Sequence, residues 1–185
     1  MLIDITLKIT PQMIKESPSN GNKALTGHLG THFDVMDKEF PLAYTRRDGI
    51  VFDVSSVRGR DIGTADLEIG EIRQDMFVAF YTGFLEEVGY GSKPYFAEHP
   101  QLSDELIDIL LDKGVSIIGV DCAGIRRGKE HTPKDQYCAD RDTFVIENLC
   151  NLKAVIDGGR AFCAHTYPMN YTGMTGLPCR VIAEI

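Results

Sequence analysis

The sequence predicts an α/β (mixed α+β) fold with a mixed β-sheet and few helices, in a single domain covering residues 1–185. Apolar and polar residues alternate from Ile3 to Ile9, and this period of two indicates a strand with one buried face. Val115–Asp121 is almost wholly apolar, which is typical of a strand covered on both faces. After Ser103 the apolar residues repeat instead at the spacing of a helix.

The remaining strands are expected in short runs rich in β-branched and aromatic residues. These runs are 50–57, 75–82, 161–165 and 180–185. Pro178 comes just before the last run, where a missing amide donor does least harm. The polar stretch 58–73 is expected to be irregular.

Two helices are predicted. The first follows Ser103, whose side chain can cap its N-terminus, and it ends at Gly114. The second runs from about Phe144 to Ile156 with its apolar residues on one stripe, and a pair of glycines follows it.

The composition argues against several kinds of partner. A net charge of -8 disfavours nucleic acid and anionic membranes, because both reward a basic face. No apolar run approaches the ~20 residues of a membrane span, and Asp4 interrupts the run that a signal peptide needs. The five cysteines form no C-x-x-C pair, so we expect free thiols in a reducing cytoplasm. No flavin or nicotinamide fingerprint is present, which disfavours redox chemistry with those cofactors. The expected partner is a small-molecule substrate.

The segment GHLGTHFD, residues 27–34, concentrates residue types that bind divalent metals. In an extended strand His28, His32 and Asp34 point to one face, but the two histidines would then lie about 13 Å apart at ~3.3 Å per residue. One ion cannot span that distance, so the backbone must bend, and Gly27 and Gly30 permit a bend at low cost. The alternative is a chance grouping of polar surface residues.

The segment HLGTHFD resembles the H-x-G-T-H-x-D signature of the cyclase-type metal-dependent hydrolases, the family that includes bacterial kynurenine formamidase and isatin hydrolase. Three further segments match that family in its order. They are SIIGVD at 116–121, VIENLCNL at 145–152 and the ending GLPCRVIAEI.

The resemblance implies a compact, small barrel-like mixed sheet with few helices, the cyclase-like swivelling β/β/α fold, in a homodimer or higher homo-oligomer. It makes His28, His32 and Asp34 metal ligands, with Asp34 able to bridge two ions, and it makes Glu147 a ligand of a second ion. The cofactor implied is a divalent metal, Zn²⁺ before Mn²⁺, with one or two ions bound. The alternative for Glu147 is a solvent-facing residue at the start of the second helix.

Two positions depart from the family. Lys38 stands where formamidase-like members carry a histidine that shuttles protons, and Asp135 stands where a histidine ligand is common, twelve residues before Glu147. Either His131 or Asp135 could complete the second site. Hydrolysis of an amide-type bond, the activity of this family, also needs a group that protonates the leaving nitrogen. The candidates for this role are His131, Lys38 and Asp121, in that order.

The activity implied is that of an arylformamidase-like hydrolase, cleaving an amide-type C–N bond with metal-activated water. N-formylkynurenine, from tryptophan catabolism, and cyclic amides are the substrates that the family suggests. Lys38 keeps open the alternative of a family member that binds metal or a small ligand without turnover. The pair Arg126-Arg127 is expected either to be solvated or to contact a substrate carboxylate.

Overall fold

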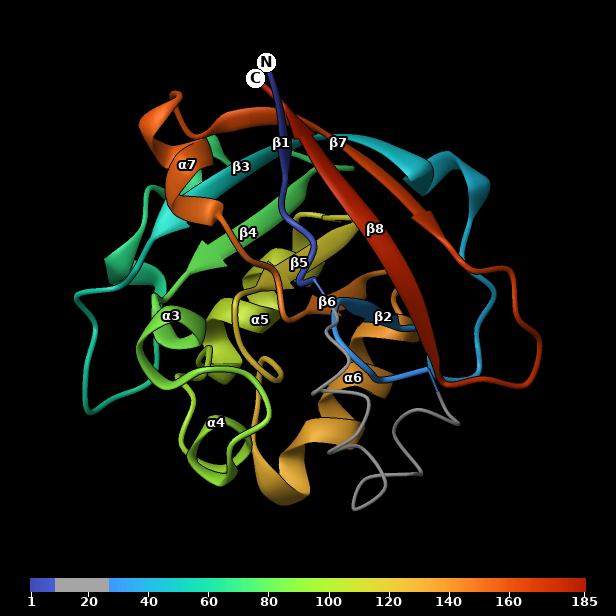
Figure 1. Ribbon diagram of the computed structural model, residues 1–185, viewed down its shortest axis with the longest axis horizontal. Coiled ribbons are helices and arrows are strands. Elements are labelled where there is room, and N and C mark those ends of the chain that lie inside the picture. Colours follow the sequence, from blue (N-terminus) through green and yellow to red (C-terminus); the bar gives the residue numbers. More distant parts are fainter. Residues whose placement is uncertain (9–26) are drawn as a thin grey trace.

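The computed structural model describes residues 1–8 and 27–185, which fold around one large mixed sheet (Figure 1). Its strands are β1 (Leu2–Asp4), β2 (His32–Asp34), β3 (Arg46–Asp53), β4 (Phe77–Tyr81), β5 (Ile117–Val120), β6 (Phe144–Glu147), β7 (Ala161–Pro168) and β8 (Gly176–Glu184). Their spatial order is β1-β8-β2-β6-β5-β4-β3-β7, and a further pairing of β7 with β8 closes the sheet into a seven-stranded barrel. The expectation of a barrel-like mixed sheet is therefore confirmed.

The barrel combines a parallel half and an antiparallel half. Strands β3, β4, β5 and β6 pair in parallel, whereas β2, β7 and β8 pair with their neighbours antiparallel. Strand β1 lies against β8 outside the closed ring (Figure 1). All four residues of β5 are buried, as expected for a strand covered on both faces.

Short helices surround the barrel. The α-helices are α3 (Phe84–Val88), α4 (Lys93–Ala97), α5 (Asp104–Asp112), α6 (His131–Ala139) and α7 (Leu152–Asp157). The 3₁₀ turns are η2 (Leu42–Thr45), η3 (Thr64–Asp66), η4 (Ile69–Glu71) and η5 (Gly128–Glu130). Among the described residues, no helix is long and apolar enough to cross a membrane.

Alternating side chains of the parallel strands supply two separate cores. Phe77 of β4 and Ile117 of β5 point into the barrel interior, where they pack with residues of β2, β6 and β8. Their chain neighbours Val78 and Ile118 point outward and pack under α5. Because a strand has a side-chain period of two, one run of apolar residues fills both cores.

Helix α5 forms as predicted. The Ser103 hydroxyl accepts a hydrogen bond from the Leu106 amide at 3.1 Å, which caps the helix. Gly114, with φ +68°, follows the last turn, and its left-handed conformation favours glycine.

The prediction of a helix over 144–156 is wrong for its first half. Phe144–Glu147 is strand β6, buried between β5 and β2, and the helix is only α7. Asn148 and Asn151 have φ values of 58° and 56°, and this left-handed backbone separates the strand from the helix. A short apolar run does not by itself distinguish a buried strand from a buried helix, and the partner strands decide it.

Other predicted boundaries also shift. The run expected at 50–57 is β3 and begins earlier, at Arg46, and the last strand begins at Gly176, so Pro178 lies inside it. Pro178 has no amide to donate, and the next residue, Cys179, donates its own to the Thr31 carbonyl of the neighbouring chain segment at 3.1 Å. Residues 58–73 are irregular with two 3₁₀ turns, as expected, and Ile9 lies outside the described residues.

A glycine in β5 offers a test of this packing. A Cβ added at Gly119 would lie 2.4 Å from the Phe77 ring and 2.8 Å from Leu149, so Gly119→Ala forces the barrel interior to shift. We expect the free energy of unfolding in urea to fall by about 1–3 kcal/mol. The control is Gly70→Ala, where an added Cβ meets nothing within 4 Å. Equal stability of the two variants would contradict this account.

Candidate metal centre

The bend expected in residues 27–34 is present. Gly27 and Gly30 have φ values of 84° and 72°, and a Cβ at Gly27 would lie 1.9 Å from the Gly176 carbonyl oxygen. The turn places the rings of His28 and His32 with their centroids 4.9 Å apart, far closer than a straight strand allows. Only the last three residues of the segment, His32–Asp34, form strand β2.

The three predicted ligands of this segment converge. Asp34 Oδ1 lies 3.0 Å from His28 Nε2 and 3.6 Å from His32 Nε2. His32 Nδ1 lies 2.8 Å from the Gly30 carbonyl oxygen, so that ring nitrogen carries the proton it donates. This hydrogen bond leaves His32 Nε2 with its lone pair directed at the cluster, the arrangement of a metal-ligating histidine.

Glu147 joins the same cluster from the neighbouring strand. The sheet register pairs His32 of β2 directly with Glu147 of β6, and His32 Nε2 lies 3.6 Å from Glu147 Oε2. The alternative of a solvent-facing glutamate is wrong, because Glu147 is buried. Its place depends on β6 being a strand, which brings the side chain beside a residue more than a hundred positions earlier in the chain.

Helix α6 supplies both candidates for the second site. His131 and Asp135, four residues apart, lie on one face of the helix, with His131 Nε2 3.2 Å from Asp135 Oδ2. The same nitrogen lies 3.2 Å from Glu147 Oε1. The structure therefore places both of these side chains, and not one of them alone, in the cluster.

The cluster consists of two groups that share one carboxylate. His28, His32 and Asp34 form one, and Asp34, His131, Asp135 and Glu147 form the other, with the potential ligand atoms of each within 4.8 Å of one another. Within the described part of the chain, His32 Nε2, Asp34 Oδ2 and Asp135 Oδ1 are buried without a hydrogen-bond partner. Burying such atoms unsatisfied is costly. The imidazole and carboxylate donors therefore fit one or two divalent cations.

The electrostatics of the cluster also favour a bound cation. Burial acts to lower the pKa of His32, but the charges of Asp34 and Glu147 outweigh it and raise that pKa. Burial acts to raise the pKa of Asp34, but His32 and His28 hold it well below its usual range. For Asp135, burial and then the charges of Asp34 and Glu147 all raise the pKa. The carboxylates thus repel one another, and a cation between them relieves that repulsion.

A hydrogen-bonded shell that the sequence did not reveal supports the turn. The Gly30 amide donates to the Tyr90 hydroxyl at 2.9 Å, and Asn148 Nδ2 donates to the Gly30 carbonyl at 2.9 Å. The Tyr95 hydroxyl donates to Asn148 Oδ1 at 2.7 Å, and the Thr31 hydroxyl donates to the Asn148 carbonyl at 2.7 Å. No sequence motif joins these residues, because their contacts span separate segments of the chain.

Lys38 is not brought into the cluster. Its ammonium lies 2.8 Å from Asp140 and 3.3 Å from Asp37, contacts that raise the pKa of Lys38 and make it a poorer proton acceptor. Asp140 directly follows α6, and His131 begins that helix. At ~1.5 Å per residue the two ends of the helix are about 13 Å apart.

Asp121 is engaged elsewhere. Its carboxylate accepts hydrogen bonds from the Thr82 amide and hydroxyl and from the Gly83 amide, at 2.6–3.0 Å. These contacts hold the turn that leads into α3. Asp121 therefore fixes the backbone after β4 and does not contribute to the metal-binding groups found among the described residues.

The chain is similar to a known family and to several solved structures. The Cyclase family model, described as "Putative cyclase", matches residues 3–126. A potential metal-dependent hydrolase with cyclase activity shares 22% identity, covering 99% of this chain and 96% of its own with a TM-score of 0.75. A predicted metal-dependent hydrolase from Bacillus stearothermophilus shares 21% identity, with 99% and 97% covered and a TM-score of 0.72. Isatin hydrolase A from Labrenzia aggregata shares 17% identity, with 99% and 93% covered and a TM-score of 0.73.

At these identities the solved structures show that the fold is shared. Among curated proteins, no sequence matches this chain.

The metal centre predicts the metal content of the purified protein. We expect elemental analysis to find a divalent metal in the wild type, and His32→Ala to bind it at least about tenfold more weakly, because the substitution removes one of the imidazoles of the cluster. Lys38→Ala, which changes a residue outside the cluster, should keep the wild-type metal content. Equal metal in the wild type and in His32→Ala would refute the centre.

A second prediction concerns the buried Asp121 carboxyl. Burial, opposed by hydrogen bonds from Thr82 and Gly83, raises its pKa from 3.8 to about 6. Between about pH 4 and 6 the folded state binds this proton and the unfolded state does not, so the contribution of Asp121 to stability falls as the pH rises through that window. The fall amounts to about 3 kcal/mol at 1.36 kcal/mol per pKa unit.

The measurement is the free energy of unfolding of the wild type and of Asp121→Asn, from pH 4 to pH 8. The stability of the wild type relative to the variant should decline up to about pH 6 and stay constant above it. Parallel profiles across the whole range would contradict the raised pKa.

Proposed function

The chain belongs to the Cyclase family, whose model covers residues 3–126, and from this premise we propose that the protein is a metal-dependent hydrolase that cleaves an amide-type C–N bond. One observation carries the proposal. Two imidazole–carboxylate groups converge in a buried cluster and share Asp34. Metal-dependent hydrolases, isatin hydrolase among them, adopt the same fold and support the assignment.

The ligand sets follow from the two groups. We assign a first divalent ion to His28, His32 and Asp34, and a second to Asp34, His131, Asp135 and Glu147. Mixed nitrogen and oxygen donors suit Zn²⁺, with Mn²⁺ as the alternative. Three buried carboxylates favour two ions, because one divalent charge leaves the cluster negative.

A divalent ion at this site supplies a Lewis acid that polarises a substrate carbonyl and activates water. In the hydrolysis itself, water adds to the carbonyl carbon, the C–N bond breaks, and the leaving nitrogen takes up a proton. The solvent-facing side of the cluster consists of His28 and His131, whose side chains are 22% and 32% exposed. Substrate therefore approaches from the side of these two histidines.

The number of ions decides what His131 does. With only the first ion bound, His131 Nε2 is available to protonate the leaving nitrogen, and Asp135 and Glu147, each 3.2 Å away, orient its ring. With two ions bound, His131 is a ligand. Lys38 and Asp121 are not assigned this role, because other groups engage both side chains.

For the substrate, we propose an aryl formamide such as N-formylkynurenine first and a cyclic amide second. One alternative is a protein that binds metal or a small ligand without turnover. It is favoured by Lys38, which stands where formamidase-like members have a proton-shuttling histidine and is held in an ion pair with Asp140. We further propose a homodimer located in the cytoplasm. The five cysteines, all present as free thiols, support a reducing compartment.

The proposal predicts metal-dependent turnover. We expect the protein, loaded with Zn²⁺ or Mn²⁺, to hydrolyse formanilide or isatin, to lose activity on treatment with a chelator, and to recover it when the metal is restored. Glu147→Gln should lower kcat at least about tenfold, because it weakens the second group of ligands. Lys38→Ala is the matched control and should stay within about twofold of the wild type.

Turnover that survives complete metal removal would contradict the mechanism. If the metal-loaded protein cleaved no formamide, lactam or related ester, the alternative of binding without turnover would stand instead.

A further inference from the structure

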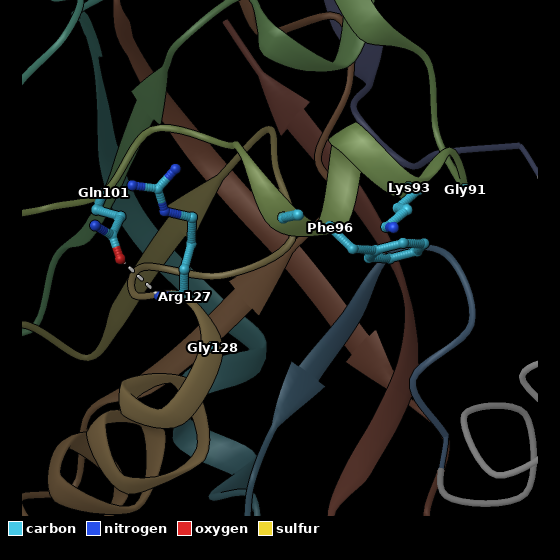
Figure 2. A pocket seen from close by; sticks show the side chains of 7 residues that line it. Gly91, Lys93, Phe96, Gln101, Arg127 and Gly128 are labelled. Carbon is cyan, nitrogen blue, oxygen red and sulfur yellow. Dashed lines mark hydrogen bonds between the residues drawn. The ribbon is translucent and has the colours of Figure 1, made fainter.

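A cavity of about 760 Å³ opens between α4 and the segment that leads into α6. Figure 2 shows Lys93 beside the Phe96 ring on one side of it, and Arg127 with Gln101 on the other. The volume is within the range of sites for small ligands, ~300–1,000 Å³.

The lining of this cavity is basic in an acidic protein. Among the described residues that line it are two cations, Lys93 and Arg127, and no carboxylate, although the chain has a net charge of -8. The adjacent arginine behaves differently, since Arg126 is buried and pairs with Asp61 at 2.7 Å and also with Glu130. In contrast, neither cavity cation forms an ion pair with another residue that the structure describes.

The same chain segments form the cavity wall and the metal centre. Gly128 lines the cavity and begins η5, and His131 follows directly after that turn. On the other side the Phe96 ring packs against Tyr90, with centroids 6.0 Å apart, and the Tyr90 hydroxyl accepts the Gly30 amide of the His28–His32 turn. The cavity is therefore built on the same two segments that position His131 and the His28–His32 turn.

Two of the residues that line the cavity are glycines. Gly91 and Gly128 have φ values of 89° and 58°, which favour glycine, and an added Cβ at either meets no described atom within 4 Å. The left-handed backbone at these two positions therefore forms part of the cavity wall without side chains.

We infer that this cavity is the subsite for a carboxylate on the amide substrate, so that the substrate class is an aromatic or similarly flat amide that carries a carboxylate. The inference rests on the proposed hydrolase function. Arg127, half-buried, presents a planar fork that matches a carboxylate in bidentate fashion. Phe96 offers a flat apolar wall, and the exposed Lys93 beside it adds positive potential at the opening.

The test compares two substrates of nearly the same shape, the anionic 3-formamidobenzoate and the neutral 3-formamidobenzamide, by their release of formate from the metal-loaded protein. The wild type should prefer the acid, as measured by the ratio of the two kcat/KM values. Arg127→Gln should lower this ratio about tenfold, and Lys93→Gln about threefold because its ammonium is exposed. Lys129→Gln, which removes a nearby exposed charge outside the lining, should leave the ratio unchanged.

An unchanged ratio in Arg127→Gln, or an equal fall in Lys129→Gln, would overturn the subsite. If the metal-loaded wild type cleaves neither amide, calorimetry with the same two compounds tests the subsite independently of turnover, and the hydrolase proposal is decided by the wider panel of formamides, lactams and esters. Tighter binding of the acid than of the amide, lost in Arg127→Gln, would support the subsite, and equal affinities would overturn it.

Discussion

The burial of three carboxylates in one cluster is the constraint on which the rest of the molecule depends. Asp34, Asp135 and Glu147 are between 2% and 4% exposed, and each contributes to the same group of potential ligands. Removing charges from water costs several kcal/mol per ion unless opposite charge offsets it. The three imidazoles in contact with these groups offset part of that cost, and a bound divalent ion offsets more. A cation bound in this cluster would therefore stabilise the folded protein.

The barrel sets the relative positions of the side chains in the cluster. A three-residue strand, β2, lies between β6 and β8, and its register sets His32 opposite Glu147. Because the sheet is closed, this pairing is fixed on both sides of β2. Hydrogen bonds that involve Tyr90, Tyr95 and Asn148 then hold the Gly30 turn. This turn keeps the rings of His28 and His32 close together. Hydrogen bonds of this kind orient ligands that would otherwise rotate.

The basic side chains around the centre differ in whether they are paired with carboxylates. Arg126 is paired with acidic side chains, whereas its chain neighbour Arg127 lines the cavity beside α4. Among the residues that the structure describes, Arg127 has no ion-pair partner and the cavity lining holds no carboxylate, which suits an anionic ligand. Lys38, by contrast, is committed to Asp37 and Asp140 at the far end of α6 from His131. Position relative to the centre, more than residue type, determines which cations can act on a substrate.

The sequence by itself determined the features that depend on local chemistry. The glycines of GHLGTHFD permit the bend that a shared metal ion requires, the capped helix after Ser103 forms as its residues indicate, and Val115–Asp121 contains the fully buried strand β5. Tertiary structure alone decided that Phe144–Glu147 is a strand and that α6 carries His131 and Asp135 into the cluster. Helix α6 has weak apolar periodicity, since one of its buried side chains is Asp135 itself, and an apolar run of four residues fits a strand or a helix equally well. The conformation of both segments depends on partners distant in the chain. Pairing with β2 and β5 buries Phe144–Glu147 as a strand, and only the shared cluster offsets the cost of burying the Asp135 charge of α6.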